Sequence, residues 1–226
     1  MTNIDTTTWL PYMNSWYEKY EFLADPYIKL GKLSDSVLSD LLNEIHIENF
    51  SALPRASNID YSGYGLITMD GLMQSWGTRT DPDNQVGLTH NGFIKSVQNI
   101  PSLSCNVDAP ITYSLLNNFD NIKRAHYAKL GANSKLNVHA DNPYQEGLRF
   151  QINLSGPEDI IYLFNGTEFS IRPGEIFWLN TGVPHCVING SQPRISLIVD
   201  VAFNGDLTNQ ISAIKSNLET NQYLTS

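Results

Sequence analysis

Cysteine, long apolar runs and a basic leader segment are scarce or absent in this chain of 226 residues. Its two cysteines, Cys105 and Cys186, lie far apart and form neither a disulfide framework nor a cysteine metal motif. No stretch approaches the roughly 18 apolar residues that a membrane-spanning helix needs. The first residues lack the basic segment and the following apolar run of a signal peptide. We therefore expect a soluble, cytoplasmic protein without a membrane partner.

Positive charge is scarce as well, because 14 Lys and Arg stand against 23 Asp and Glu, for a net charge of -9. A chain of this charge repels phosphate backbones and anionic lipid, so we expect no nucleic-acid partner. Its 41% of hydrophobic and 16% of charged residues are typical of a folded rather than a disordered chain. No feature of the sequence predicts an oligomeric state.

The length and the lack of internal repeats predict one domain, residues 1–226, built of three parts. Residues 1–105 form a helical and loop-rich N-terminal region, residues 106–203 a β-rich core, and residues 204–226 a C-terminal helix. Within the first part, the composition of residues 51–92 predicts long loops that cover a binding site.

Two helices are predicted from apolar residues at helical spacing behind a capping residue. Ser34 caps the first, and Asp206 caps the second. The apolar positions are Val37, Leu38, Leu41, Leu42 and Ile45 in the first helix, and Leu207, Ile211, Ile214 and Leu218 in the second. Residues 1–30 carry many aromatics without clean periodicity, and we expect an arm or a short helix there.

From about residue 110 the chain changes to short β-like runs separated by turn residues. The nine runs are ITYSLL, RAHYAKL, KLNVH, LRFQINLS, DIIYLF, TEFSIR, EIFWL, HCVIN and RISLIVDV. Asn165-Gly166 separates two of them by two residues that tolerate positive φ, which predicts a hairpin. So many short strands predict an antiparallel barrel or a jelly roll.

Two histidines and an aspartate suggest a metal site on these strands. His139 and Asp141 are two positions apart at a strand end, so their side chains share one face. His185 follows a turn and begins a later strand-like run. Two histidines and one carboxylate are the facial triad of non-haem Fe(II) oxygenases, which leaves coordination positions open. The similar pair His46 and Glu48 lies at the end of a predicted helix, where such positions do not face each other, and we reject it.

Arginines on two further strands suggest a carboxylate-binding site. Arg194 and Ser196 share one face of their strand, and a guanidinium beside a hydroxyl suits a carboxylate. Arg149 is a second candidate, in a run where it shares one face with Gln151 and Asn153. The opposite face of that run is apolar, a pattern typical of a strand that lines a cavity.

Four segments together resemble the aspartyl/asparaginyl β-hydroxylase family, which belongs to the Fe(II)/2-oxoglutarate-dependent dioxygenases and is related to free-proline hydroxylases. The segments, within about residues 124–203, are AKLGANSKLNVHADN, LRFQINL, PGEIFWLNTGVPHCVING and PRISLIVDV. The resemblance implies a mostly β fold, a double-stranded β-helix (a cupin-like jelly roll) with flanking N- and C-terminal α-helices. It also implies Fe(II), 2-oxoglutarate as co-substrate, and O2.

The resemblance further implies roles for individual residues. His139, Asp141 and His185 match the iron ligands, and Arg194 matches the arginine that binds the distal carboxylate of 2-oxoglutarate. The cofactor-binding residues would be Arg194, Ser196, Arg149 and Gln151. Gln151 stands where the family has a histidine, so co-substrate binding is expected to differ in detail.

The activity we expect is hydroxylation of an amino-acid-like or peptidyl substrate of the Asp, Asn or Pro type, with release of succinate and CO2. Two alternatives stay open. A metal-binding cupin of another type, an isomerase or a co-substrate-free dioxygenase, would stay active without Arg194. A non-catalytic jelly-roll sensor would form no succinate coupled to a substrate.

Overall fold

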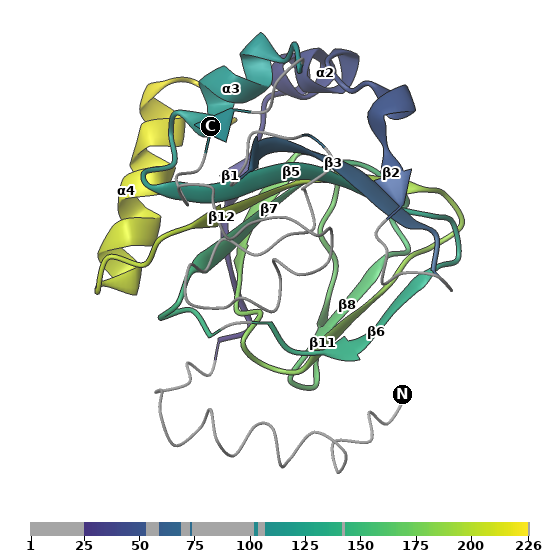
Figure 1. Ribbon diagram of the computed structural model, residues 1–226. Helices are drawn as coiled ribbons and strands as arrows, with labels where there is room; N and C mark the ends of the chain where they lie inside the picture. The colour runs from purple at the N-terminus through teal and green to yellow at the C-terminus, as the bar shows by residue number, and fades with distance from the viewer. Residues whose placement is uncertain are drawn as a thin grey trace, which may run out of the picture.

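The computed structural model describes residues 25–52, 59–68, 73, 102–103, 107–141 and 143–225. Two antiparallel β-sheets lie opposite each other, and helices pack outside the larger one (Figure 1). The larger sheet has the order β1-β10-β7-β12-β5-β3-β2, with β4 also paired to β3, and the smaller has the order β6-β11-β8-β9. This arrangement confirms the expected mostly β fold with flanking helices.

Strands far apart in the chain are neighbours in both sheets. The strands of the larger sheet are β1 (Tyr27–Lys32), β2 (Ser51–Ala52), β3 (Tyr61–Thr68), β4 (Ser102–Leu103), β5 (Ile122–Leu130), β7 (Leu148–Ser155), β10 (Glu175–Leu179) and β12 (Arg194–Val201). Those of the smaller sheet are β6 (Lys135–His139), β8 (Ile161–Phe164), β9 (Thr167–Phe169) and β11 (His185–Ile188). The turn between β8 and β9 is the predicted hairpin, with φ of 45° at Asn165 and 82° at Gly166.

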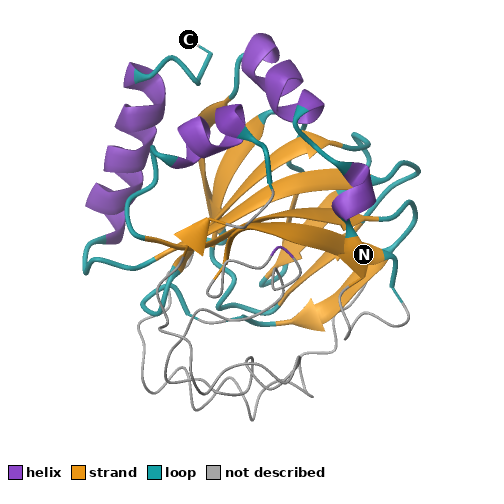
Figure 2. Cartoon of the chain, turned by 45° about the horizontal axis from the view of Figure 1, so that its top comes forward, coloured by secondary structure: helices purple, strands orange, loops and turns teal. Residues whose placement is uncertain are grey.

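The helices lie on the outer side of the larger sheet (Figure 2). They are α2 (Asp35–Asn43), the 3-10 turn η1 (Ile47–Asn49), α3 (Pro110–Leu116) and α4 (Leu207–Thr220). Both predicted caps are confirmed, because Ser34 accepts the N–H of Val37 and Asp206 accepts the N–H of Asn209. No helix in the described part of the chain has the length and apolar character needed to cross a membrane.

Three local predictions were wrong. The run ITYSLL forms helix α3 rather than a strand, because the carboxylate of Glu44 accepts the N–H groups of Ile111 and Thr112 at its start. Strand β3 lies in the stretch predicted as loops, since its pairing with β5 buries Tyr64 and Leu66.

Strand β1 begins at Tyr27, so it takes up the end of residues 1–30, where we expected an arm or a short helix. It pairs with β10 at the edge of the larger sheet and so gains backbone hydrogen bonds that no local pattern reveals. The aromatics before residue 25 lie outside the described residues. Most of residues 69–92, the remainder of the predicted loops, lie outside them as well.

Two apolar clusters lie on opposite sides of the larger sheet. One fills the space between its outer face and the helices, and it includes Phe150 and Ile152 of β7 and Ile214 of α4. The other lies between the sheets, and it includes Phe164 of β8 and Phe177 of β10. The inner face of the larger sheet also carries polar and charged side chains from β5, β7 and β12, and the candidate site is built on these.

Candidate metal centre

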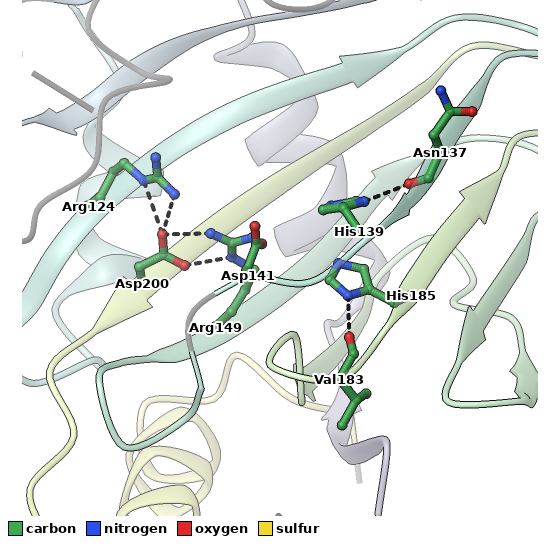
Figure 3. Close-up of polar contacts among 8 residues, drawn as sticks. All are labelled: Arg124, Asn137, His139, Asp141, Arg149, Val183, His185 and Asp200. Carbon is green, nitrogen blue, oxygen red and sulfur yellow. Dashed lines mark hydrogen bonds and ion pairs between the residues drawn. The ribbon is translucent and has the colours of Figure 1, made fainter. Parts of the chain in front are cut away.

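Two histidines and one aspartate converge at one end of the smaller sheet (Figure 3). His139 ends β6 and His185 begins β11, and the two residues are direct cross-strand partners. Their ring centroids are 4.3 Å apart. Asp141 lies just beyond β6, where its N–H donates to the carbonyl of Thr181 at 2.8 Å. One potential ligand atom from each of the three side chains lies within 4.8 Å of the others.

Main-chain carbonyls fix the tautomer of both histidines. Nδ1 of His139 lies 2.7 Å from the carbonyl oxygen of Asn137, and Nδ1 of His185 lies 2.8 Å from that of Val183. Because a carbonyl can only accept, each Nδ1 carries the hydrogen and donates it. In the neutral form of each ring Nε2 then keeps its lone pair, and this orientation by an outer partner is typical of histidines that bind metals.

The electrostatics favour the protonation states that a divalent metal requires. Burial, and then the nearby charge of His139, lower the pKa of His185 to about 4, although Asp141 opposes the shift. Burial would raise the pKa of Asp141, but Arg149 and the two histidines outweigh it and lower that pKa to about 2. At neutral pH the site thus offers a neutral imidazole and an ionised carboxylate, the forms that coordinate metals.

Arg149 lies beside this triad, in contact with two carboxylates. It donates to Asp141, and through Nε and Nη2 it also donates to Asp200 at 2.8 and 3.1 Å. Asp200 accepts from Arg124 as well. The structure therefore places Arg149, a predicted contact of the co-substrate, within a network of ion pairs.

Arg194 lies in a second polar cluster, which is almost fully buried. Its guanidinium donates to the hydroxyl of Tyr162 on β8, and the Arg194 residue is only 3% exposed. Ser196 donates to Asn153 at 2.8 Å, and Gln151 donates to Asn153 at 2.9 Å. The structure thus brings the predicted residues Arg194, Ser196 and Gln151 together, with Arg149 and the histidines outside this cluster.

One property of Arg194 separates it from the other inward-facing arginines. Within the described residues no carboxylate lies at ion-pair distance from Arg194, and its Nε has no hydrogen-bond partner. The contacts of its guanidinium are the Tyr162 hydroxyl and the ring below it, whose centroid is 5.4 Å away. A buried cation thus lies between the sheets with no anionic side chain beside it in the described part of the chain.

Three residues at these two clusters were missed by sequence reasoning: Tyr162, Asp200 and Arg124. A lone tyrosine in the apolar run DIIYLF has the pattern of a core residue. Asp200 had a usable signal, since strand alternation places it on the same face as Arg194 and Ser196. Its pairing with Arg124 depends on the order of strands in the sheet, which the local pattern does not contain.

Comparison with known proteins gives a family and a fold. The family model for aspartyl/asparaginyl β-hydroxylase matches residues 85–203. No curated protein matches the chain in sequence. Among solved structures, the chain is similar to an oxidoreductase of the 2OG-Fe(II) oxygenase family from Burkholderia pseudomallei. That likeness has 13% identity and a TM-score of 0.51, and it covers 78% of this chain and 84% of the other.

Other similar structures share a smaller part of the chain. A predicted oxalate decarboxylase from Thermotoga maritima is 18% identical over 41% of this chain and 74% of its own, with a TM-score of 0.31. A Cupin_2 domain of an XRE family transcriptional regulator from Enterobacter cloacae is 12% identical over 36% and 82%, also with a TM-score of 0.31. At these scores the likeness carries no argument about activity.

Proposed function

The chain belongs to the aspartyl/asparaginyl β-hydroxylase family, and we propose that it hydroxylates an amino-acid-like or peptidyl substrate of the Asp, Asn or Pro type. The family is one of 2-oxoglutarate-dependent dioxygenases, so the chain is an enzyme that uses Fe(II), 2-oxoglutarate and O2. In the proposed reaction 2-oxoglutarate is converted to succinate and CO2 as the substrate is hydroxylated.

His139, Asp141 and His185 would hold the Fe(II) ion. They offer two imidazole nitrogens with available lone pairs and one carboxylate, the donor set of the facial triad, which leaves positions for other ligands. When bound, the ion supplies O2 activation and oxidation of the substrate's C–H bond. The chain's own task is to orient both imidazoles, and the carbonyls of Asn137 and Val183 do this before any ligand arrives.

The observation that carries the proposal is the buried charge of Arg194. Burying an ion costs several kcal/mol unless an opposite charge and hydrogen bonds compensate. Arg194 has no carboxylate partner among the described residues, so an anionic ligand fits there. A carboxylate would accept from the guanidinium, in charge-assisted bonds stronger than the present one to Tyr162. We assign the C5 carboxylate of 2-oxoglutarate to this position.

Neighbouring side chains would complete the co-substrate site. The hydroxyl of Ser196 lies on the same strand face as Arg194, within the hydrogen-bonded cluster that includes Gln151. In our proposal Ser196 contacts the same carboxylate, and Gln151, where the family has a histidine, holds Ser196 and Tyr162 in place. Strands β7 and β12, which carry Gln151 and Ser196, are paired, and the side chains of the cluster are buried.

Turnover with a substrate panel tests the proposal. The purified protein is incubated with Fe(II), 2-oxoglutarate, and free or peptidyl Asp, Asn and Pro, and succinate is quantified alongside hydroxylated product. We expect succinate in a one-to-one ratio with product for one class, and none for His185→Ala. Turnover without 2-oxoglutarate would favour a cupin of another type. Binding of 2-oxoglutarate with no coupled succinate would favour a sensor.

A further inference from the structure

Four charged side chains form a continuous chain of ion pairs that ends at the proposed metal ligand Asp141. Asp200 on β12 accepts from Arg124 on β5 and from Arg149 on β7, and Arg149 also donates to Asp141 (Figure 3). All four side chains are at least 70% buried. The contacts therefore run from Arg124 to Asp200, then to Arg149, and end at Asp141.

Strand register fixes the first three members. Asp200 is the direct cross-strand partner of Arg124 in the pairing of β12 with β5. It is also the direct partner of Arg149 in the pairing of β12 with β7. Nε and Nη2 of Arg149 both lie on the Asp200 carboxylate, a two-pronged contact that fixes the plane of the guanidinium. The third nitrogen, Nη1, is thereby directed at Asp141.

The surrounding charges give Arg149 and Arg194 different roles. Around Arg149, two guanidinium groups are balanced by the two carboxylates of Asp141 and Asp200, so these side chains leave no excess positive charge for an added anion. Arg194 has no such carboxylate among the described residues. The distal carboxylate of the co-substrate therefore gains far more at Arg194 than at Arg149.

Asp141 needs external support, because it lies beyond the end of β6. Its N–H is held by Thr181, and its side chain is held through Oδ2 by Arg149. Oδ1 receives no hydrogen bond from the described residues and remains available to a metal. We propose that Arg149 is a positioning residue, which Asp200 locks in place and which orients the Asp141 carboxylate for the metal, rather than an anchor of 2-oxoglutarate. This inference rests on the proposed metal role of His139, Asp141 and His185.

Separate affinities for metal and co-substrate distinguish the two roles. The full chain is titrated with Mn(II) well below its unfolding temperature. The free ion is quantified by its electron paramagnetic resonance signal. The dissociation constant of 2-oxoglutarate is then measured at saturating Mn(II). The variants are Arg149→Lys, Arg194→Lys and Asp200→Asn, with the exposed Arg172→Lys as matched control. Because the lysine variants keep the positive charge, a loss of affinity in them reports on the paired N–H donors of the guanidinium group.

We expect Arg149→Lys and Asp200→Asn to weaken Mn(II) binding about 10- to 100-fold, as is usual for the outer partners of ligands, and to alter the spectrum of bound Mn(II). Their 2-oxoglutarate affinity should change less than about threefold, whereas Arg194→Lys should show the opposite pattern and Arg172→Lys no change. If one variant fails to fold, the other decides.

Unchanged Mn(II) affinity in both Arg149→Lys and Asp200→Asn would overturn the inference, and a loss of 2-oxoglutarate affinity alone would make Arg149 an anchor. His139→Ala separates this outcome from failure of the proposed function. If His139→Ala also keeps full Mn(II) affinity, the metal centre itself is wrong. If His139→Ala loses Mn(II) while Arg149→Lys keeps it, only the positioning role is wrong.

Discussion

Each histidine ring of the proposed metal centre is oriented by the carbonyl two residues before it in its own chain segment. Nδ1 of His139 donates to Asn137, and Nδ1 of His185 donates to Val183. The two local contacts are the same, although the histidines lie on different strands. The rings therefore present their Nε2 atoms without help from a bound ion, and the site is preorganised.

The stability of the metal-free protein should fall as the pH is lowered. The pKa of His185 is about 4 in the folded protein and ordinarily 6.5. The contribution of the neutral ring to the free energy of unfolding is therefore complete above pH 6.5 and is lost as the pH falls to about 4. The pKa of Asp141 is lowered from 3.8 to about 2, so its contribution is lost below about 4. Urea midpoints at pH 7, 4.5 and 3 should decrease in that order.

A variant tests whether His185 causes the decrease in the urea midpoint between pH 7 and 4.5. His185→Gln removes the titrating ring and should show a smaller drop between pH 7 and 4.5 than the wild type. A wild-type midpoint that is constant between these two values would contradict the buried, neutral state of His185.

At the scale of single residues, candidate site residues could be predicted from the sequence where strand alternation alone decides which face a side chain occupies. His139, Asp141 and His185 were selected in this way together with the family resemblance, and the structure brings them within reach of one ion. Their role as ligands stays a prediction. Tyr162 could not be selected, because its partners lie on strands of the opposite sheet. Strand alternation places Asp200 on the inner face, but its partners depend on the order of strands in the larger sheet.

At the scale of elements, helix α3 shows how a contact between distant segments overrides local preference. The run ITYSLL contains β-branched and aromatic residues, and by pattern it predicts a strand. The Glu44 carboxylate, 67 positions earlier, accepts from Ile111 at 2.6 Å and from Thr112 at 2.8 Å. These bonds satisfy N–H groups that the first turn of a helix leaves open, and Pro110 has no N–H to satisfy. The opposite error, at β3, arises because pairing with β5 outweighs a composition typical of loops.

Removing this cap should destabilise the fold by an amount typical of a lost N-cap. We expect Glu44→Ala to lower the free energy of unfolding by about 1–2 kcal/mol, because two backbone N–H groups and the Thr112 hydroxyl lose their acceptor. Urea denaturation measures the change. Glu48→Ala is the control, since among the described residues its exposed carboxylate contacts only His46, and it should change stability by less than about 0.5 kcal/mol. Equal effects of the two substitutions would show that Glu44 does not hold α3.

At the scale of the whole molecule, the two faces of the larger sheet have different roles: one stabilises the fold and the other carries the polar groups of the proposed site. Its outer face packs on the helices in a large apolar cluster. Its inner face carries the ion pairs at Asp200 and the buried cluster at Arg194, which are costly to desolvate. The β-rich architecture was predictable because most strands alternate clearly. The division into three parts of one domain, the cytoplasmic location and the absence of a nucleic-acid partner stay predictions.

The most direct test of a 2-oxoglutarate site between the sheets is the dissociation constant of 2-oxoglutarate with Mn(II) in place of iron, where no turnover occurs. Removing one member of a buried charge-assisted pair costs about 2–5 kcal/mol, so Arg194→Ala should weaken binding roughly 30- to 5,000-fold. Arg172→Ala, at an exposed arginine, should bind like the wild type. If Arg194→Ala binds 2-oxoglutarate as tightly as the wild type, the buried guanidinium does not anchor the co-substrate, and the proposed site is wrong.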